Sequence, residues 1–209
     1  MKQKDSHIIK RIALLTSLLI AFSLQSKAIE TAAQLISKCA NTVNNAPSLV
    51  VKATVSAAQE SFVVNMTLSR ERFVFDYPQM KVWYDGTTQW TYIKGNRELN
   101  ITEPTQEELL EINPFAILNF YRKAYTARRL ESTTPTIELV AKEPTATIRK
   151  AVITIDPAND MPSKIVVTFS NGHTLTATIT SITRGKTKSP SAFIFDKDKY
   201  PTAEIVDLR

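Results

Sequence analysis

The sequence is poor in cysteine, histidine and glycine. Its 209 residues include one cysteine, two histidines and four glycines. A single cysteine excludes an intrachain disulfide, so the fold must be held together by its hydrophobic core. That residue, Cys39, lies on the apolar stretch of a predicted helix, where we expect a small buried side chain rather than a reactive thiol.

The scarcity of histidine and glycine also narrows the chemistry. Apart from His7 near the N-terminus, the one histidine is His173, which follows an Asn-Gly pair and should be exposed. A histidine triad or metal site would rest on His173 alone, with no Gly-x-Ser-x-Gly motif beside it. No two glycines are closer than nine positions, which excludes a glycine-rich phosphate loop. We expect no catalysis, no metal and no cofactor; an enzyme would need His173 buried against a carboxylate.

The N-terminus has the pattern of a secretory signal peptide. Basic residues precede the apolar run 12–22, and Ser26-Lys27-Ala28 supplies the small residues that a signal peptidase needs. The run is too short to span a bilayer comfortably. We expect cleavage near Ala28, an exported and soluble mature chain, and a single domain over residues 29–209.

Most of the positive charge belongs to this leader. The chain has 26 basic and 20 acidic residues, a net charge of +6. Residues 1–28 hold five of the basic and one of the acidic residues, which leaves 21 and 19 and a net charge of +2. The mature chain therefore gives no reason to expect nucleic-acid binding.

Hydrophobic periodicity predicts a helix followed by many strands. Apolar residues recur at three-and-four spacing over 31–43, on one face of a helix that Pro47 ends. From Leu49 onward apolar residues alternate with polar ones, which is typical of half-buried strands. We expect strands around 62–68, 73–77, 137–142, 151–156, 164–170, 174–181 and 193–196.

A helical insert interrupts the strands in mid-chain. Thr105 and Glu108 form a capping box that opens a first short helix, and Asn113-Pro114 separates it from a second. Glu107, Glu108 and Glu111 form a cluster of carboxylates, and a glycosidase-type pair among them stays open as an interpretation. The capping role of Glu108 is a sufficient explanation for its presence. These elements predict an α+β fold: one strongly curved, unclosed antiparallel sheet, with the N-terminal helix and the insert on its concave apolar face.

The segment 83–92 carries a more specific signal. It reads Trp-Tyr-Asp-Gly-Thr-Thr-Gln-Trp-Thr-Tyr, two short aromatic strands about an Asp-Gly turn in which Gly86 can take a positive φ. An Asp-Gly-x-Thr-x-Trp-x-Tyr hairpin after an aromatic strand resembles the signature of the LolA family of periplasmic lipoprotein carriers. The resemblance extends over most of the mature chain, including the 156–162 turn and the ending from Phe193 to Asp207, where the family has a Phe-x-Phe strand.

The resemblance implies an incomplete β-barrel whose apolar cavity shields lipoprotein acyl chains in the periplasm. It implies acylated lipoproteins as cargo, an inner-membrane release complex and an outer-membrane acceptor as partners, and we expect a monomer. The expected cavity residues are Phe62, Val64, Met66, Phe73, Phe75, Tyr77, Trp90, Tyr92, Ile165, Val167 and Phe169. The expected lid residues are Leu109, Leu110, Ile112, Phe115 and Leu118.

Two other interpretations stay open. Apolar stripes usually belong to an ordinary core, so these aromatic residues need not line a cavity at all. The same half-barrel also serves RseB-like modules, which bind a lipid or protein partner as sensors. A sizeable apolar cavity would favour a carrier or lipid sensor over a purely structural domain.

The chain departs from the family pattern at the lid latch. The family often has Arg-Pro before its first aromatic strand, with that arginine latching the lid, whereas this chain reads Ser69-Arg70-Glu71-Arg72-Phe73. Arg70 and Arg72 are both candidates for the latch. The insert 104–121 also looks like that of a divergent branch, so the cargo could differ from ordinary triacylated lipoproteins.

Overall fold

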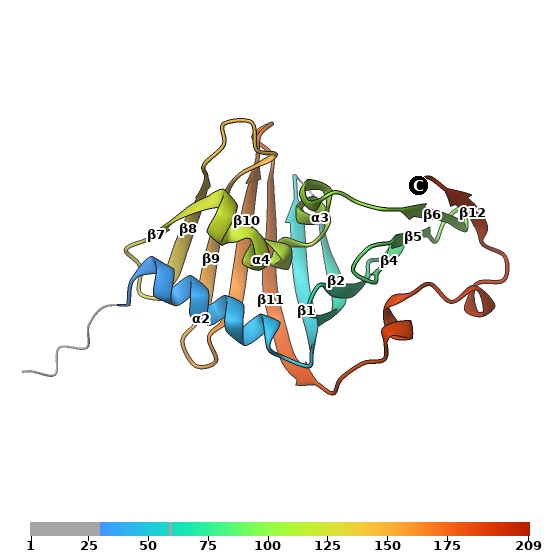
Figure 1. Ribbon diagram of the computed structural model, residues 1–209, viewed down its shortest axis with the longest axis horizontal. Coiled ribbons are helices and arrows are strands. Elements are labelled where there is room, and N and C mark those ends of the chain that lie inside the picture. The colour runs from blue at the N-terminus through green and yellow to red at the C-terminus, as the bar shows by residue number, and fades with distance from the viewer. Residues whose placement is uncertain (1–29, 59) are drawn as a thin grey trace, which may run out of the picture. The chain divides into compact units, whose positions relative to one another are not determined.

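Twelve strands form one sheet that is not closed into a barrel (Figure 1). The structure is a computed structural model that describes residues 30–58 and 60–209, so the predicted signal peptide lies outside the described residues. The described fold is one compact unit, Thr31–Arg209. The strand order is β12-β6-β5-β4-β3-β2-β1-β11-β10-β9-β8-β7, antiparallel except for β12, which runs parallel to β6. The α+β half-barrel prediction is confirmed.

The strands comprise two meanders. The first contains β1 (Ser48–Ala57), β2 (Glu60–Ser69), β3 (Arg72–Asp76), β4 (Met80–Tyr84), β5 (Gln89–Ile93) and β6 (Glu98–Thr102). The second contains β7 (Tyr125–Arg129), β8 (Thr136–Ala141), β9 (Ile148–Asp156), β10 (Met161–Phe169) and β11 (Thr174–Gly185), and the chain ends with β12 (Glu204–Asp207).

The β1–β11 ladder joins the two meanders. It runs from Ser48 opposite Gly185 to Ala57 opposite Leu175, with a register shift between Lys52 and Ala53. The buried Ser48 hydroxyl donates to the carbonyl of Lys186 at 2.8 Å. A Cβ at Gly185 would lie 2.5 Å from that hydroxyl oxygen, so a larger residue there would have to displace the buried Ser48 side chain.

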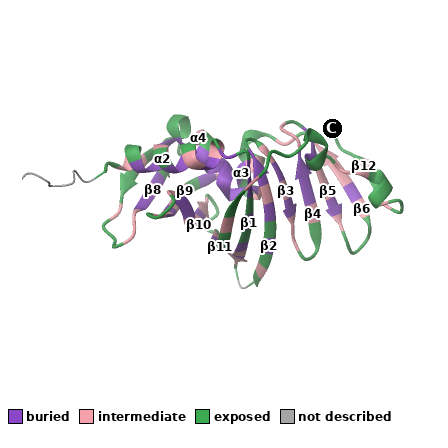
Figure 2. Cartoon of the chain, turned by 90° about the horizontal axis from the view of Figure 1, so that it is seen from below, coloured by how far each residue is buried: buried purple, intermediate pink, exposed green. Residues whose placement is uncertain are grey.

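Helix α2 (Ala32–Asn44) packs its apolar face on the second meander. Its N-cap, Thr31, forms a capping box with Gln34. Leu35, Ile36 and Cys39 are buried, and the helix contacts β7, β8 and β10. Figure 2 shows α2 on the same side of the sheet as the helical insert, which consists of α3 (Gln106–Ile112), the 3-10 helix η1 (Pro114–Ala116) and α4 (Ile117–Ala124).

The prediction of a strand at 193–196 is wrong, because these residues form no strand. The 3-10 helix η2 (Pro190–Phe193) occupies its start, and a second one, η3 (Lys197–Lys199), follows after Asp196. Proline has no N–H for a strand ladder and favours the first turn of a helix. The Asp196 carboxylate then accepts a hydrogen bond from the Asp198 amide and caps η3.

Candidate functional site

The candidate site is the apolar core between the helices and the sheet, which we call the main core. Nine of the eleven expected cavity residues belong to it. Val64, Met66, Phe73, Phe75, Ile165 and Val167 are buried in it, and Phe62, Tyr77 and Phe169 pack against it. Alternation along β2, β3 and β10 places these side chains on one face of the sheet.

The two remaining expected cavity residues, Trp90 and Tyr92, do not pack with the other nine. Both belong to a second cluster on the opposite face, which we call the aromatic cluster and which contains Trp83, Trp90, Tyr92, Leu99, Phe195 and Tyr200. The hairpin register explains the separation, because Trp83 pairs with Trp90 while the neighbouring Tyr84 pairs with Phe73. Neighbouring positions in one strand point to opposite faces. Assigning Trp90 and Tyr92 to the same cavity as Phe73 was therefore wrong.

The aromatic cluster is where the chain's C-terminal segment packs. The Trp83 ring lies edge-on to Phe195 and Tyr200, at centroid distances of 5.5 and 5.6 Å. The centroids of the Tyr92 and Tyr200 rings are 4.7 Å apart. These contacts give the Trp83–Tyr92 hairpin a structural role that the sequence pattern alone does not reveal.

The helical insert covers the main core. All five expected lid residues contribute: Leu110, Phe115 and Leu118 are buried in the core, and Leu109 and Ile112 pack against it. The predicted capping box opens α3, which ends at Ile112. The side chain of the next residue, Asn113, accepts a hydrogen bond from the Phe115 amide. The predicted break between two short helices is thus confirmed.

Polar contacts tie the insert to its surroundings at a few points. The Arg122 guanidinium of α4 donates to the Ser37 hydroxyl of α2 at 2.9 Å. Lys142 donates to the carbonyls of Arg122 and Lys123 at the end of α4. On α3, the Glu107 carboxylate accepts from the Thr147 hydroxyl at 3.1 Å. The helices are therefore held mainly by apolar packing.

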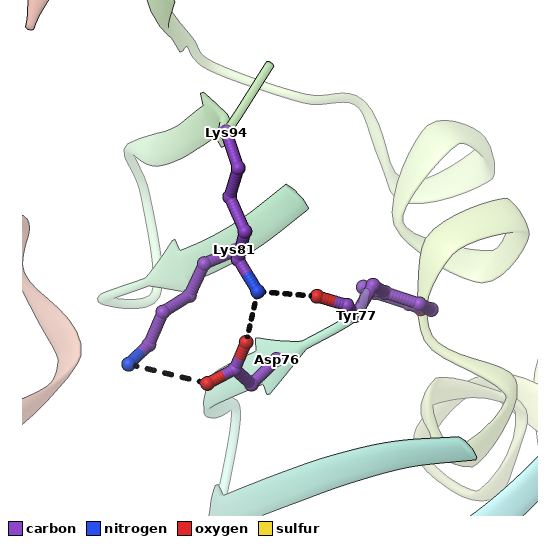
Figure 3. Close-up of polar contacts among 4 residues, drawn as sticks. All are labelled: Asp76, Tyr77, Lys81 and Lys94. Atoms are coloured by element: carbon purple, nitrogen blue, oxygen red, sulfur yellow. Dashed lines mark hydrogen bonds and ion pairs between the residues drawn. The ribbon is translucent and has the colours of Figure 1, made fainter. Parts of the chain in front are cut away.

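Tyr77 links the sheet to the break in the insert. Its hydroxyl donates to the Ile112 carbonyl at 3.4 Å, and burial raises the pKa of this hydroxyl to about 12. The backbone of Tyr77 is fixed from the other side: Lys94 donates to its carbonyl and also pairs with Asp76 at 2.7 Å (Figure 3). Lys81 lies 3.6 Å from the other Asp76 oxygen, and the Tyr77 ring points away from both lysines.

A small opening leads to the main core at one end of the insert. Its volume is about 140 Å³, and its apolar walls include Leu110, Phe120, Tyr125 and Ile148. Small-molecule sites usually have roughly 300–1,000 Å³, so this opening is smaller than a typical ligand site. Sequence reasoning missed Tyr125 and Ile148, because the short strand β7 is mostly polar and Ile148 follows a loop.

The two latch candidates lie in different places. Arg70, which has a positive φ of 55°, lines a small pocket with Asn113, Phe115 and Asn119 of the insert. Arg72 is on β3 with its guanidinium carbon 5.3 Å from the centre of the Phe193 ring, so it faces the C-terminal segment. Only Arg70 is close to the insert, and it makes no hydrogen bond to it among the described residues.

His173 is exposed rather than buried against a carboxylate. No group of three or more metal-binding side chains occurs in the described part of the chain. Cys39 is fully buried, and burial raises its pKa to about 12. Within residues 30–58 and 60–209, no helix is long and apolar enough to cross a membrane.

The sequence matches the family of the outer membrane lipoprotein carrier protein LolA over residues 22–172. This chain belongs to the LolA family. The match spans the first helix, the hairpin and the insert, and it confirms the resemblance drawn from the Asp-Gly-x-Thr-x-Trp-x-Tyr motif. No curated protein sequence matches this LolA-family chain closely enough to count as a relative.

One solved structure supports the same fold, and two others are more distantly similar. An uncharacterized conserved protein from Thermus thermophilus is 12% identical with a TM-score of 0.52, over 84% of this chain and 98% of that one. A LolA superfamily protein from Nitrosomonas europaea is 12% identical with a TM-score of 0.45, over 80% and 99%. MucB, in a complex of MucA and MucB from Pseudomonas aeruginosa, is 10% identical with a TM-score of 0.43, over 80% of this chain and 62% of that one.

Proposed function

We propose that this protein is a periplasmic carrier that binds the acyl chains of lipoproteins in the main core and delivers them toward the outer membrane. The observation that carries the proposal is the main core itself, covered by an insert that is broken at Asn113-Pro114 and opens beside Leu110 and Phe120. Membership of the LolA family supports it. The protein has no catalytic role in this proposal.

The free-energy cost of exposing an acyl chain to water explains why a carrier needs an apolar binding site. Exposing one acyl chain of roughly 15 methylenes to water costs about 12 kcal/mol, at about 0.8 kcal/mol per methylene. The carrier must also release its cargo. An insert held mostly by apolar packing can exchange its contacts with the sheet for contacts with an acyl chain, whereas a lid fixed by many hydrogen bonds could not.

A release assay tests the proposal. The exported chain, residues 29–209, is added to spheroplasts that carry lipoproteins, with a matched inner-membrane release complex present. We expect a soluble carrier–lipoprotein complex, compared with buffer and with a general lipid-binding protein. Leu110→Gln, at the opening, should reduce its yield several-fold. Val140→Gln is the matched control, because Val140 is 44% exposed on β8. Absence of complex formation would refute carriage.

A second function of a different class is a sensor or assembly module that binds a protein partner, as MucB occurs in complex with MucA. The small volume of the opening, about 140 Å³, favours it, because the main core is already filled by its own side chains. Lack of lipoprotein release, together with capture of one protein partner by the folded chain, would favour this function.

A further inference from the structure

A polar pocket of about 390 Å³ lies at the end of the sheet where α2 stops and β1 begins. Its walls come from the loop 44–47, the turn between β2 and β3, and Thr187, which follows β11. Figure 1 shows the ends of α2 and β11 beside the start of β1. The volume falls within the roughly 300–1,000 Å³ that is usual for ligand sites.

Two arginines line this pocket without a partner for their charge. Arg70 is exposed and Arg72 is half-buried. In the described part of the chain, neither guanidinium donates a hydrogen bond or pairs with a carboxylate, and the lining contains no aspartate or glutamate. Charged groups that leave bulk water are normally paired. The pocket therefore lacks an anion.

An aromatic ring restrains the side chain of Arg72. Its guanidinium carbon lies 5.3 Å from the centre of the Phe193 ring, and Phe193 is fully buried. Such a contact fixes the guanidinium without using a hydrogen-bond acceptor, so its N–H donors remain available. The nitrogen atoms of Arg72 are not buried, and they are accessible from the pocket. The cation is thus positioned before any ligand arrives.

Two buried serines hold the walls in place. The Ser69 hydroxyl donates to the Pro47 carbonyl at 2.9 Å, which ties the end of β2 to the loop 44–47. The Ser48 hydroxyl donates to the Lys186 carbonyl at 2.8 Å, which fixes the chain next to Thr187. Because both bonds connect different elements, the pocket is preformed.

Neutral donors and a further cation complete the surroundings. The side chains of Asn44, Asn45 and Thr187 line the pocket, and they make no hydrogen bond within residues 30–58 and 60–209. Arg184 lies across the loop, in a neighbouring pocket that also includes Asn45. Glu71 is between the two arginines in sequence but is not part of the lining. The local charge is therefore positive.

We propose that this pocket binds a phosphate group. A phosphate monoester carries a charge of about −1.5 to −2 and three acceptor oxygens, which match two guanidinium groups and the neutral donors. A carboxylate has one charge and two oxygens, and it would leave one arginine unpaired. The phosphate can be a lipid head group or part of a free compound. The proposal does not rest on acyl carriage, because this pocket shares no lining residue with the opening beside Leu110.

Nuclear magnetic resonance titration of ¹⁵N-labelled residues 29–209 tests the proposal. Inorganic phosphate is the free probe, and dihexanoylphosphatidic acid is a soluble lipid with a phosphate head group. Acetate and dihexanoylphosphatidylcholine, whose choline balances the charge, are the controls. We expect saturable shifts of the Arg70 and Arg72 Nε–H signals and of the Thr187 amide, reduced by added salt. Tighter binding of phosphatidic acid than of inorganic phosphate indicates a lipid head group, and the reverse indicates a free compound.

Variants locate the site. Arg72→Gln should weaken phosphate binding about tenfold or more, because it removes a charged hydrogen-bond donor from a half-buried position. Arg72→Lys keeps the charge but not the planar donors, so its loss should be smaller. Arg70→Gln should weaken binding about two- to fivefold, as expected for an exposed charge. Arg149→Gln is the matched control, since it removes the same charge from an exposed residue of β9 outside the lining.

Several results would overturn the proposal. They are failure of both phosphate probes to bind, acetate binding of equal affinity, unchanged binding in a folded Arg72→Gln chain, and an equal loss with Arg149→Gln. Circular dichroism and a urea midpoint verify that Arg72→Gln folds. Phosphate binding without lipoprotein release would refute the carrier function and leave this proposal standing.

Discussion

The hydroxyl of Tyr77 donates a hydrogen bond to the carbonyl of Ile112, the last residue of α3, at 3.4 Å. This bond joins the end of β3 to the point where the insert breaks. The ring of Tyr77 also packs edge-on against Phe62, with centroids 5.7 Å apart. Tyr77 is therefore a better candidate than either arginine for the residue that holds the insert closed.

Replacing Tyr77 with phenylalanine should loosen the insert without unpacking the core. The ring stays and one long hydrogen bond is lost, so we expect a destabilisation of about 0.5–1 kcal/mol. Hydrogen exchange of the α3 and η1 amides should become faster than in the wild type. The control is Tyr200→Phe, which removes a hydroxyl from the aromatic cluster. Unchanged exchange in α3 would show that the bond does not hold the insert.

Alkaline pH should destabilise the protein. Burial raises the pKa of Tyr77 and of Cys39 to about 12 each. Because the unfolded chain loses these protons at lower pH, their contribution is complete below about pH 8.5 and is lost as pH rises toward 12. The slope is about 1.4 kcal/mol per pH unit for each proton. Urea titrations from pH 8 to 12 measure the slope of the unfolding free energy against pH. Tyr77→Phe should make this slope shallower above pH 10. An equal slope in the variant would contradict this assignment.

Pro114 should control movement of the insert. Proline disfavours helical geometry at the preceding residue, and Asn113 has φ −117° and ψ 97°. Pro114→Ala removes this restriction and should let α3 and η1 approach a continuous helix. We expect altered rates of cargo uptake and release with a change in unfolding free energy below about 1 kcal/mol. Pro144→Ala, at an exposed loop proline, is the control. Unchanged rates of uptake and release would show that Pro114 does not act as a hinge.

The thiol of Cys39 should be protected in the native state. Its exposed fraction is 0%, and its raised pKa leaves little thiolate at pH 8. Alkylation by iodoacetamide should therefore be slow in buffer and fast in urea, measured by mass spectrometry. Similar rates in both would mean that α2 opens readily from the sheet.

The two faces of the sheet should respond separately to truncation of an aromatic ring. Phe195→Ala removes a ring from the aromatic cluster and should speed proteolysis within residues 186–209 while cargo binding persists. Its destabilisation should not exceed the about 3–5 kcal/mol seen for fully buried rings. Phe120→Ala, at the opening of the main core, is the matched change and should weaken binding of a fluorescent fatty acid. Equal effects of both variants on fatty-acid binding would contradict two independent clusters.

Local patterns in the sequence predicted the elements well. The spacing of Leu35, Ile36 and Cys39 gave the first helix, and Thr105 with Glu108 gave the start of α3. The hairpin 83–92 formed as expected, with the Asp85 carboxylate accepting from the amides of Thr87 and Thr88. Each of these signals lies within a few residues, where capping and alternation act directly.

The sequence did not predict in the same way which face of the sheet each set of alternating apolar residues occupies. Alternation shows that Trp90 and Tyr92 share a face, but the register across the turn decides which one. Their partners Phe195 and Tyr200 come from a distant segment whose pattern suggested a strand. The parallel pairing of β12 with β6 is likewise non-local. A contact between distant segments leaves no periodic signal in either of them.

The ladder between β1 and β11 also bears on how fast the protein folds. Each meander contains pairs of strands that are close in sequence, which can form early. The hydrogen bond between Ser48 and Lys186 joins residues 138 positions apart, so closing this seam orders a very long loop. Folding rates fall as such long-range contacts accumulate. We expect association of β1 with β11 to be the slow step, and the edges of both strands to stay open to other chains until it is complete.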